Sequence, residues 1–109
     1  MKILASEYYR NRRGNCAQSI AGAWQQKTSQ QSSLLAELSG CGGGGAPGGL
    51  CGALYATQRI VSDKQQAENI LDQFRLISGG HVTCKELLGK LPCRQCVEIA
   101  ADLLDKHLP

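Results

Sequence analysis

The 109-residue chain has little of what several large protein classes depend on. No run of apolar residues approaches the roughly 20 that a membrane-spanning helix needs, so we expect no association with a membrane. Its aromatic residues are one Phe, one Trp and three Tyr, too few for a platform that stacks single-stranded nucleic acid. The net charge of only +3 gives no basic surface for DNA or RNA. Nucleic acid is therefore not an expected partner.

An export signal is also missing from the N-terminal stretch. MKILASEYYRNRR has no sustained apolar segment followed by small residues, and no hydrophobic region follows the pair Arg12-Arg13. We therefore expect a cytoplasmic protein. In that reducing compartment, cysteines serve metal or redox chemistry more often than they form structural disulfides.

Alternation of apolar and polar residues, which is typical of β-strands, does not extend over any useful length. Apolar residues recur instead at every third or fourth position, as they do along one face of a helix. The three clearest helical stripes are Ala17, Ile20, Ala21 and Trp24; Ala67, Ile70, Leu71, Phe74 and Ile77; and Val97, Ala100, Ala101, Leu104 and Leu108.

Further helices are predicted over residues 50–61 and, as short pieces, near 3–10 and 33–38. Residues 25–33 are rich in Gln, Ser and Thr and indicate an exposed connection. The chain length allows one domain, residues 1–109. We predict an all-α fold, a small bundle of about four longer helices with short helical additions and a Gly-rich loop.

Cysteine is plentiful by contrast, and its positions follow a pattern. Five of the six cysteines fall in or next to the first turn of a predicted helix, and only Cys41 lies just past the end of one. Asn15 is a good N-cap directly before Cys16, and Thr83 opens a T-x-x-E capping box directly before Cys84. The remaining three are Cys51, which follows the Gly-rich loop, and Cys93 and Cys96, which follow a proline suited to a helix start.

A position at the start of a helix affects the ionisation of a cysteine. The free N–H groups and partial positive charge of a helix N-terminus stabilise a thiolate, which is both the nucleophile and the metal ligand. If the helix starts converge, they form a pocket suited to anionic sulfur with lowered thiol pKa values, and Arg12 and Arg13 could add to its positive field. The alternative is that the cysteines only pack in the core as small apolar side chains.

The C-x-x-C formed by Cys93 and Cys96 suggests several sites. A thioredoxin-type motif is expected near a βαβ unit, and a tetrahedral zinc site usually pairs two C-x-x-C motifs, so neither pattern is complete here. His81 and His107 are further ligand candidates, although surface histidines more often have no such role. An iron–sulfur cluster accepts looser spacing and could use four cysteines: Cys16, Cys51, Cys84 and Cys93.

The stretch CGGGGAPGGLC, residues 41–51, lies inside the single predicted domain. Its G-x-G-x-x-G spacing follows no predicted strand, and no Gly-Lys-Ser/Thr follows it, so neither a dinucleotide site nor a P-loop is indicated. Backbone N–H groups of such a loop could surround a sulfur or a cluster, and a plain flexible connection is the alternative. The candidate cofactor-binding glycines are Gly42, Gly43, Gly44 and Gly45.

No catalytic set of Ser, His and Asp or of paired carboxylates is recognisable. The acidic residues of the two C-terminal helical stripes have the spacing of a solvated helix face. They are Glu68, Asp72, Glu98 and Asp102.

Four motifs occur in order along nearly the whole chain: N-C-A-Q at 15–18, C-G-A-L-Y-A at 51–56, C-K-E-L-L-G at 84–89, and C-x-x-C-V at 93–97 before a closing A-A-D-L-L. Together they resemble the C_GCAxxG_C_C family, small cysteine proteins regarded as redox-active. The chain departs from that pattern at Ala56, which replaces the second glycine of the motif, and in having Cys41 and Cys96 as additional cysteines. The resemblance implies Cys16, Cys51, Cys84 and Cys93 as the functional set.

The resemblance also implies a role and partners. Members of the family are associated with oxidoreductases or transporters, and bound iron–sulfur clusters have been suspected in them. We therefore expect a redox protein whose cysteines exchange disulfides or hold a metal centre, with an iron–sulfur cluster or zinc as cofactor. Its expected partner is an oxidoreductase or transporter component, and a homodimer is compatible with its size. A structural metal-binding module and an interaction domain with packed cysteines remain the alternatives.

Overall fold

The computed structural model of the chain describes residues 1–11, 14–28, 33–41, 45–61, 63–87 and 89–107. Within these ranges there is no strand, only an isolated antiparallel bridge between Leu50 and Thr83, and the predicted all-α fold is confirmed. None of the described helices combines the length and the apolar character that crossing a membrane requires. The helical elements are α1 (Lys2–Arg10), α2 (Cys16–Thr28), α3 (Leu34–Glu37), a 3₁₀ turn η1 (Pro47–Gly49), α4 (Gly52–Val61), α5 (Lys64–Ile77), α6 (Cys84–Leu87) and α7 (Cys93–His107).

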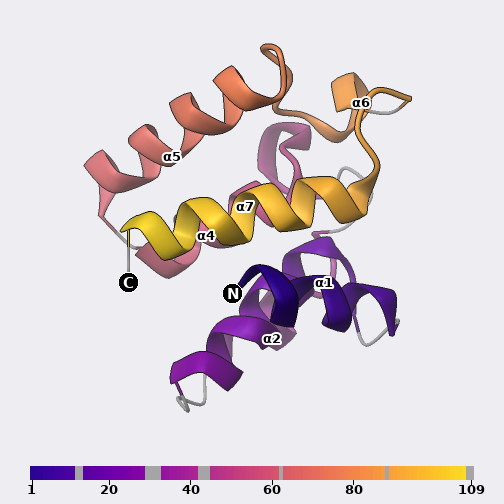
Figure 1. Ribbon diagram of the computed structural model, residues 1–109, viewed down its shortest axis with the longest axis vertical. Helices are drawn as coiled ribbons and strands as arrows, with labels where there is room; N and C mark the ends of the chain where they lie inside the picture. The colour runs from indigo at the N-terminus through magenta and orange to yellow at the C-terminus, as the bar shows by residue number, and fades with distance from the viewer. Residues whose placement is uncertain (12–13, 29–32, 42–44, 62, 88, 108–109) are drawn as a thin grey trace.

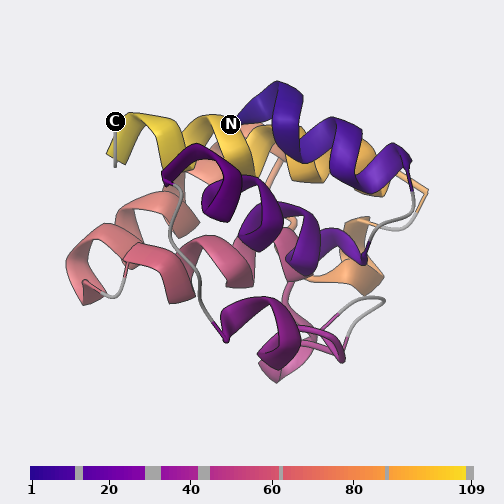
Figure 2. The same cartoon turned by 90° about the horizontal axis from the view of Figure 1, so that it is seen from below.

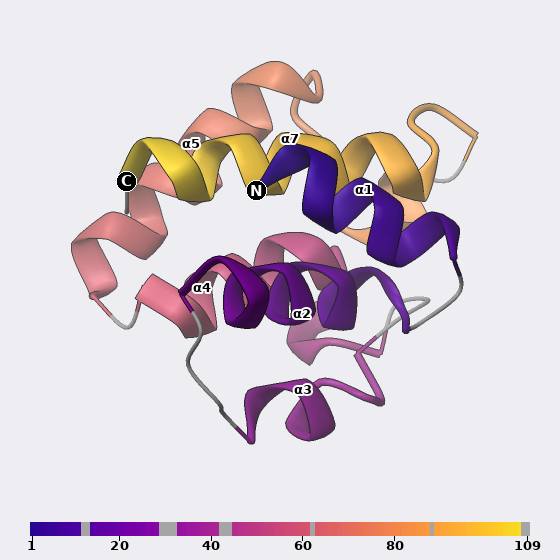
Figure 3. The same cartoon turned by 60° about the horizontal axis from the view of Figure 1, so that its bottom comes forward.

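Helix α7 is the central element of the bundle. It packs against α1 on one side and against α4 and α5 on the other, while α2 packs against both α1 and α4 (Figures 1 and 3). Helix α3 lies against α2 on the side remote from α7, as the view from below also shows (Figure 2). Helix α6 lies over the N-terminal end of α7 (Figure 1). Three of the helices that begin at or next to a cysteine, α2, α4 and α7, thus pack directly on one another.

The core is built from the predicted stripes. Ile20, Phe74, Val97 and Leu104 are fully buried, and each belongs to one of the three stripes. Ile77 departs from the prediction, because this last residue of α5 is 55% exposed. The stripes therefore identify the buried faces correctly over most of each helix.

Helix α1 is longer and better packed than the short piece predicted there. It runs for nine residues and buries Ala5 and Tyr8. The Tyr8 ring lies directly against Gly22 of α2, where any side chain on the glycine would clash with it. Within the described ranges the bundle therefore has five helices of nine residues or more, where about four longer helices were predicted.

Two boundaries also differ from the predictions. Helix α2 continues to Thr28, so part of the predicted connection is helical, and Thr28 Oγ1 donates a hydrogen bond to the Trp24 carbonyl at 2.7 Å in this last turn. Helix α4 begins at Gly52, two residues after the predicted start, because Leu50 is extended in its bridge to Thr83. Residues 29–32 of the predicted connection and Leu108 of the third stripe lie outside the described residues.

The chain leaves α5 through Gly79 and Gly80, as predicted. Both have positive φ, 76° and 98°, which glycine adopts without strain. The Gly80 N–H donates to the Arg75 carbonyl at 2.7 Å and closes the helix end. This turn directs the chain back toward Thr83 and the start of α6.

Candidate functional site

A reciprocal cap sets the start of α2. The Gln18 N–H donates to Asn15 Oδ1 at 2.7 Å, and the Asn15 N–H donates to Gln18 Oε1 at 3.1 Å. Asn15 Nδ2 also donates to the Leu38 carbonyl at 3.0 Å, which ties the cap to the segment after α3. The predicted N-cap is confirmed, and Cys16 is the first residue of its helix.

The predicted capping box sets the start of α6. The Glu86 N–H donates to Thr83 Oγ1 at 3.2 Å, and the Thr83 N–H donates to Glu86 Oε1 at 3.3 Å. Cys84 follows as the first residue of α6. The Cys51 N–H donates to the Val82 carbonyl at 2.8 Å, so the segments that carry these two cysteines are hydrogen-bonded side by side.

The C-x-x-C lies at the start of α7. The Cys96 N–H donates to the Pro92 carbonyl at 3.1 Å, so the helix begins at Cys93, as predicted. Cys93 is exposed, whereas Cys96, one turn later on the inner side of the helix, is only 3% exposed. The motif therefore combines one accessible thiol and one buried thiol.

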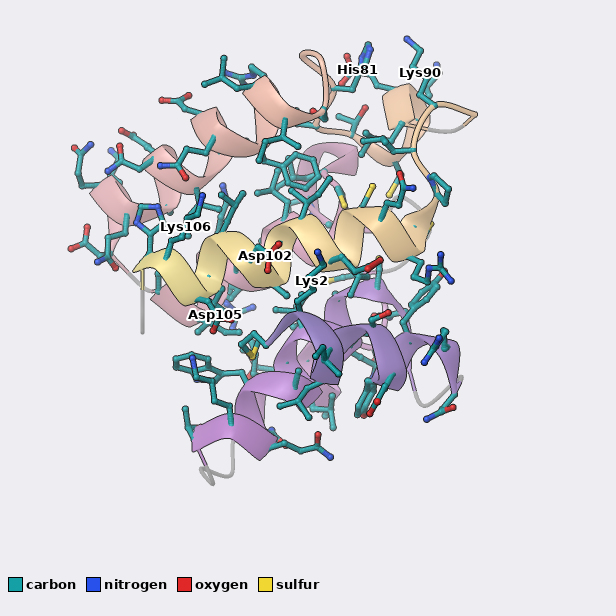
Figure 4. All side chains as sticks on the ribbon, in the orientation of Figure 1. Lys2, His81, Lys90, Asp102, Asp105 and Lys106 are labelled. Carbon is teal, nitrogen blue, oxygen red and sulfur yellow. The ribbon has the colours of Figure 1, made fainter. Side chains whose placement is uncertain are left out.

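These helix starts surround a single cavity of about 890 Å³. Five of the six cysteines line it, so the predicted convergence is confirmed, and Figure 4 shows sulfur atoms grouped between α6 and the start of α7. All six cysteines are free thiols. The lining residues are Cys16, Gly48, Gly49, Cys51, Thr83, Cys84, Lys85, Leu87, Gly89, Lys90, Leu91, Pro92, Cys93 and Cys96.

The sixth cysteine and the glycine loop contribute less to this site. Cys41 is partly buried and does not line the cavity, although its carbonyl oxygen lies against the start of α4. Gly45 is exposed and also does not line the cavity. The other glycines of the cofactor-binding prediction and the arginine pair lie outside the described residues: Gly42, Gly43, Gly44, Arg12 and Arg13.

The buried thiols differ in acidity. Hydrogen bonding with Cys96, together with burial, raises the pKa of Cys51. The same hydrogen bond lowers the pKa of Cys96, because the Cys51 thiol donates to its sulfur. Burial raises the pKa of Cys16 to about 11. Of the three buried thiols, Cys96 is therefore the one best suited to be a thiolate.

The prediction that helix starts lower the thiol pKa is wrong for Cys16 and Cys51. The backbone N–H of Ala53 does lower the pKa of both thiols, and the N–H of Leu54 lowers that of Cys51. At Cys16 burial outweighs this donor, because transferring a thiolate out of water costs more than one hydrogen bond returns. At Cys51 the hydrogen bond with Cys96, together with burial, outweighs both donors.

Tyr9 is a site residue that the sequence did not indicate. Burial and a hydrogen bond with the Cys93 side chain raise the pKa of Tyr9 to about 12, so its hydroxyl stays protonated and can donate to the Cys93 sulfur. Tyr9 belongs to α1, far from Cys93 in sequence, and the pair Tyr8-Tyr9 carries no motif that distinguishes one ring from the other.

The described residues do not offer a ready-made metal site. No three His, Cys, Asp or Glu side chains among them are close enough together to hold a metal ion. His81 Nε2 instead lies 3.0 Å from Lys90 Nζ, and His107 is in the last turn of α7, away from the cavity. A metal or cluster would require the cysteines to move toward one another, so the cofactor stays a prediction.

The four acidic residues that were assigned to solvated helix faces do not line the cavity. Asp72 and Asp102 are exposed and lie near Arg75 at 3.6 Å and Lys2 at 3.7 Å, respectively, the second pair being visible in Figure 4. Glu98, half-buried, lies 3.8 Å from Arg94, and Glu68 is exposed. Their assignment to helix surfaces holds, and they have no part in the site.

Gly52 has a steric role at this site. A Cβ at this position would lie 2.5 Å from the Cys41 carbonyl oxygen and 2.7 Å from Cys16 Sγ. Alanine usually stabilises a helix by about 1 kcal/mol relative to glycine. We expect Gly52→Ala instead to lower the free energy of unfolding by about 1–3 kcal/mol, because the start of α4 must move away from Cys16. Urea denaturation followed by circular dichroism measures this change.

Gly40→Ala is the matched control, since a Cβ there would meet no atom within 4 Å. Its stability should stay close to that of the unmodified protein. Equal stability of the two variants would show that α4 does not need the close approach to Cys16.

Comparison of the chain with models of protein families, with curated proteins and with solved structures finds no match. The family resemblance of the cysteine motifs therefore stays a prediction. The function has to be inferred from the chemistry of the five thiols and the residues around them.

Proposed function

We propose that this protein is a thiol–disulfide redox protein, with Cys93 as the entry thiol and Cys51 and Cys96 as the buried pair. The observation that carries the proposal is the hydrogen bond between Cys51 and Cys96 inside a cavity lined by three further thiols. Two sulfur atoms in such contact can form a disulfide with little movement of the backbone.

The first step uses the exposed thiol. Cys93 attacks one sulfur of a partner disulfide and forms a mixed disulfide, while the second partner sulfur leaves as a thiolate and takes up a proton. The Tyr9 hydroxyl lies within hydrogen-bonding reach of the Cys93 sulfur and can donate to it. Exposure at the start of α7 gives a partner access to this sulfur.

The second step uses Cys96. Its sulfur, with a lowered pKa, attacks Cys93 Sγ one helical turn away and releases the partner as a second thiol. Cys51 then attacks Cys96, which forms the buried Cys51–Cys96 disulfide and frees Cys93. Two electrons and two protons pass from the protein dithiol to the partner disulfide, and a dithiol reductant reverses the exchange. The resemblance adds Cys16 and Cys84 to the same redox set.

We propose a location from this chemistry and a partner from the family resemblance. Six free cysteines fit a reducing cytoplasm, where thiols are kept available for exchange. A disulfide-bearing oxidoreductase or transporter component, as the resemblance implies, would react at the exposed Cys93. A homodimer is compatible with the size of the chain.

The test is a redox titration of protein purified without oxygen. Metal and sulfide are measured first, and the protein is then equilibrated with dithiol–disulfide buffers and its disulfides are mapped by mass spectrometry. We expect reversible formation of a disulfide between two of Cys51, Cys93 and Cys96 without stoichiometric metal. Thiols that never oxidise reversibly, or that are all blocked by bound zinc or an iron–sulfur cluster, would contradict the proposal.

A further inference from the structure

We infer that the substrate of this site is a small disulfide that carries negative charge, bound within the cavity rather than against a flat protein surface. The inference rests on the proposed function and adds the substrate class to it. Three features of the cavity support it: its size, the charge of its rim and the accessibility of its thiols.

The size suits a small organic molecule. At about 890 Å³, the cavity lies in the upper part of the range of roughly 300–1,000 Å³ typical of small-molecule sites. The apolar part of the cavity wall is formed by Leu87, Leu91 and Pro92. The backbone of Gly48 and Gly49 also lines the cavity and carries no side chain. A disulfide built from two short peptides would be enclosed there with its sulfur–sulfur bond near the thiols.

The charged side chains at the rim of the cavity determine which ligand charge it favours. Among the described lining residues the charged side chains are Lys85 and Lys90, and none is a carboxylate. Both lysines are exposed at the α6 end of the cavity. A concave site with charge of one sign concentrates ligands of the opposite sign. The cavity therefore favours an anionic ligand.

Neighbouring side chains keep this positive rim in place. Lys90 Nζ lies 3.0 Å from His81 Nε2, and the two side chains lie together beyond α6 in Figure 4. Because an ammonium group can only donate, the imidazole nitrogen is the acceptor of this contact, and His81 itself does not line the cavity. The nearby Glu86 carboxylate is held by Thr83, with 3.0 Å between Glu86 Oε1 and Thr83 Oγ1, and does not line the cavity.

The thiols are placed to react with such a ligand. Cys93 is exposed, and Cys96 lies one turn deeper on the same wall. Attack by Cys93 on one sulfur of the ligand releases the first small thiol, and attack by Cys96 on Cys93 releases the second. The balance is one protein dithiol and one small disulfide giving one protein disulfide and two small thiols, and a dithiol reductant restores the protein.

The experiment compares three small disulfides that differ in charge: oxidised glutathione (anionic), bis(2-hydroxyethyl) disulfide (neutral) and cystamine (cationic). Insulin serves as a protein disulfide. Each rate of oxidation of the reduced protein at low salt is divided by the rate of the same disulfide with free dithiothreitol, which removes differences in intrinsic reactivity. We expect oxidised glutathione to be favoured at least about tenfold over cystamine, with the preference falling as salt is added.

Charge variants assign the preference to the cavity rim. The double variant Lys85→Gln/Lys90→Gln should lose most of the tenfold preference. The control Lys64→Gln/Lys106→Gln removes the same charge from exposed positions on α5 and α7 away from the cavity and should keep it. Unfolding midpoints of both variants verify that they are folded.

The outcomes separate this inference from the proposed function. Equal normalised rates for the three small disulfides, or a preference that survives Lys85→Gln/Lys90→Gln, overturn the anionic-ligand inference while disulfide exchange stands. Oxidation of the protein by insulin but by none of the three small disulfides would also overturn the anionic-ligand inference while disulfide exchange stands. If no disulfide oxidises the protein dithiol, the proposed function fails and this inference fails with it.

Discussion

Cys96→Ser should stop disulfide exchange after its first step and leave the substrate attached to Cys93. Cys96 is 3% exposed, lies one turn behind Cys93 and has its pKa lowered by the hydrogen bond from Cys51. A serine hydroxyl cannot attack the mixed disulfide. Release of the substrate from the mixed disulfide would then depend on thiols from solution. Because these lack the proximity of an internal nucleophile, turnover should fall on the order of a hundredfold or more.

Mass spectrometry after a short reaction with a disulfide substrate tests this expectation, because the trapped adduct adds the mass of half the substrate at Cys93. Cys41→Ser is the matched control, since it makes the same chemical change at a partly buried cysteine that does not line the cavity. It should resolve its adduct at the normal rate. Normal turnover of Cys96→Ser would assign the resolving role to another cysteine.

Phe74→Ala should cost about 3–5 kcal/mol of the free energy of unfolding. Phe74 is the only phenylalanine of the chain, and it is fully buried on α5, which packs against α4 and α7. Its removal leaves a cavity in a core composed largely of small and aliphatic side chains. A domain of this size has about 5–15 kcal/mol of stability, so this single change removes a large part of it.

Leu76→Ala provides the control two residues further along the same helix. Leu76 is 83% exposed, so its truncation should change stability by no more than about 0.5 kcal/mol. Urea unfolding midpoints of both variants give the comparison. A similar loss in both would mean that α5 is stabilised through its exposed face instead of through Phe74.

Most of the fold could be predicted because helical periodicity and caps are local signals. Asn15, Thr83 and the glycines after α5 each act on the backbone within a few residues, and each does what its residue type indicates. Ile77 could not be placed correctly, because its exposure depends on how α5 packs on the other helices and not on its place in the stripe. The packing of α1 depends likewise on the contact of Tyr8 with Gly22, a distant residue.

The sequence predicted which cysteines lie at helix starts, but it did not predict their pKa values or their hydrogen-bond partners. Caps place Cys16 and Cys84 at the starts of α2 and α6, but the pKa of Cys16 depends on burial under elements that come later in the chain. Tyr9 reaches Cys93 only through tertiary packing. The hydrogen bond of Cys51 with Cys96 joins α7 to the segment before α4, and no spacing rule relates the two.

The bridge between Leu50 and Thr83 has a consequence for how the protein can vary. Together with the hydrogen bond from the Cys51 N–H to the Val82 carbonyl, it joins the segment before α4 to the segment after α5. These contacts at the base of the α4–α5 hairpin therefore set the distance between the Cys51 and Cys84 segments, whatever the length of the hairpin. Insertions or deletions at the tip of this hairpin can accumulate during evolution without changing the spacing of these two thiols, since lengthening a closed loop costs little entropy.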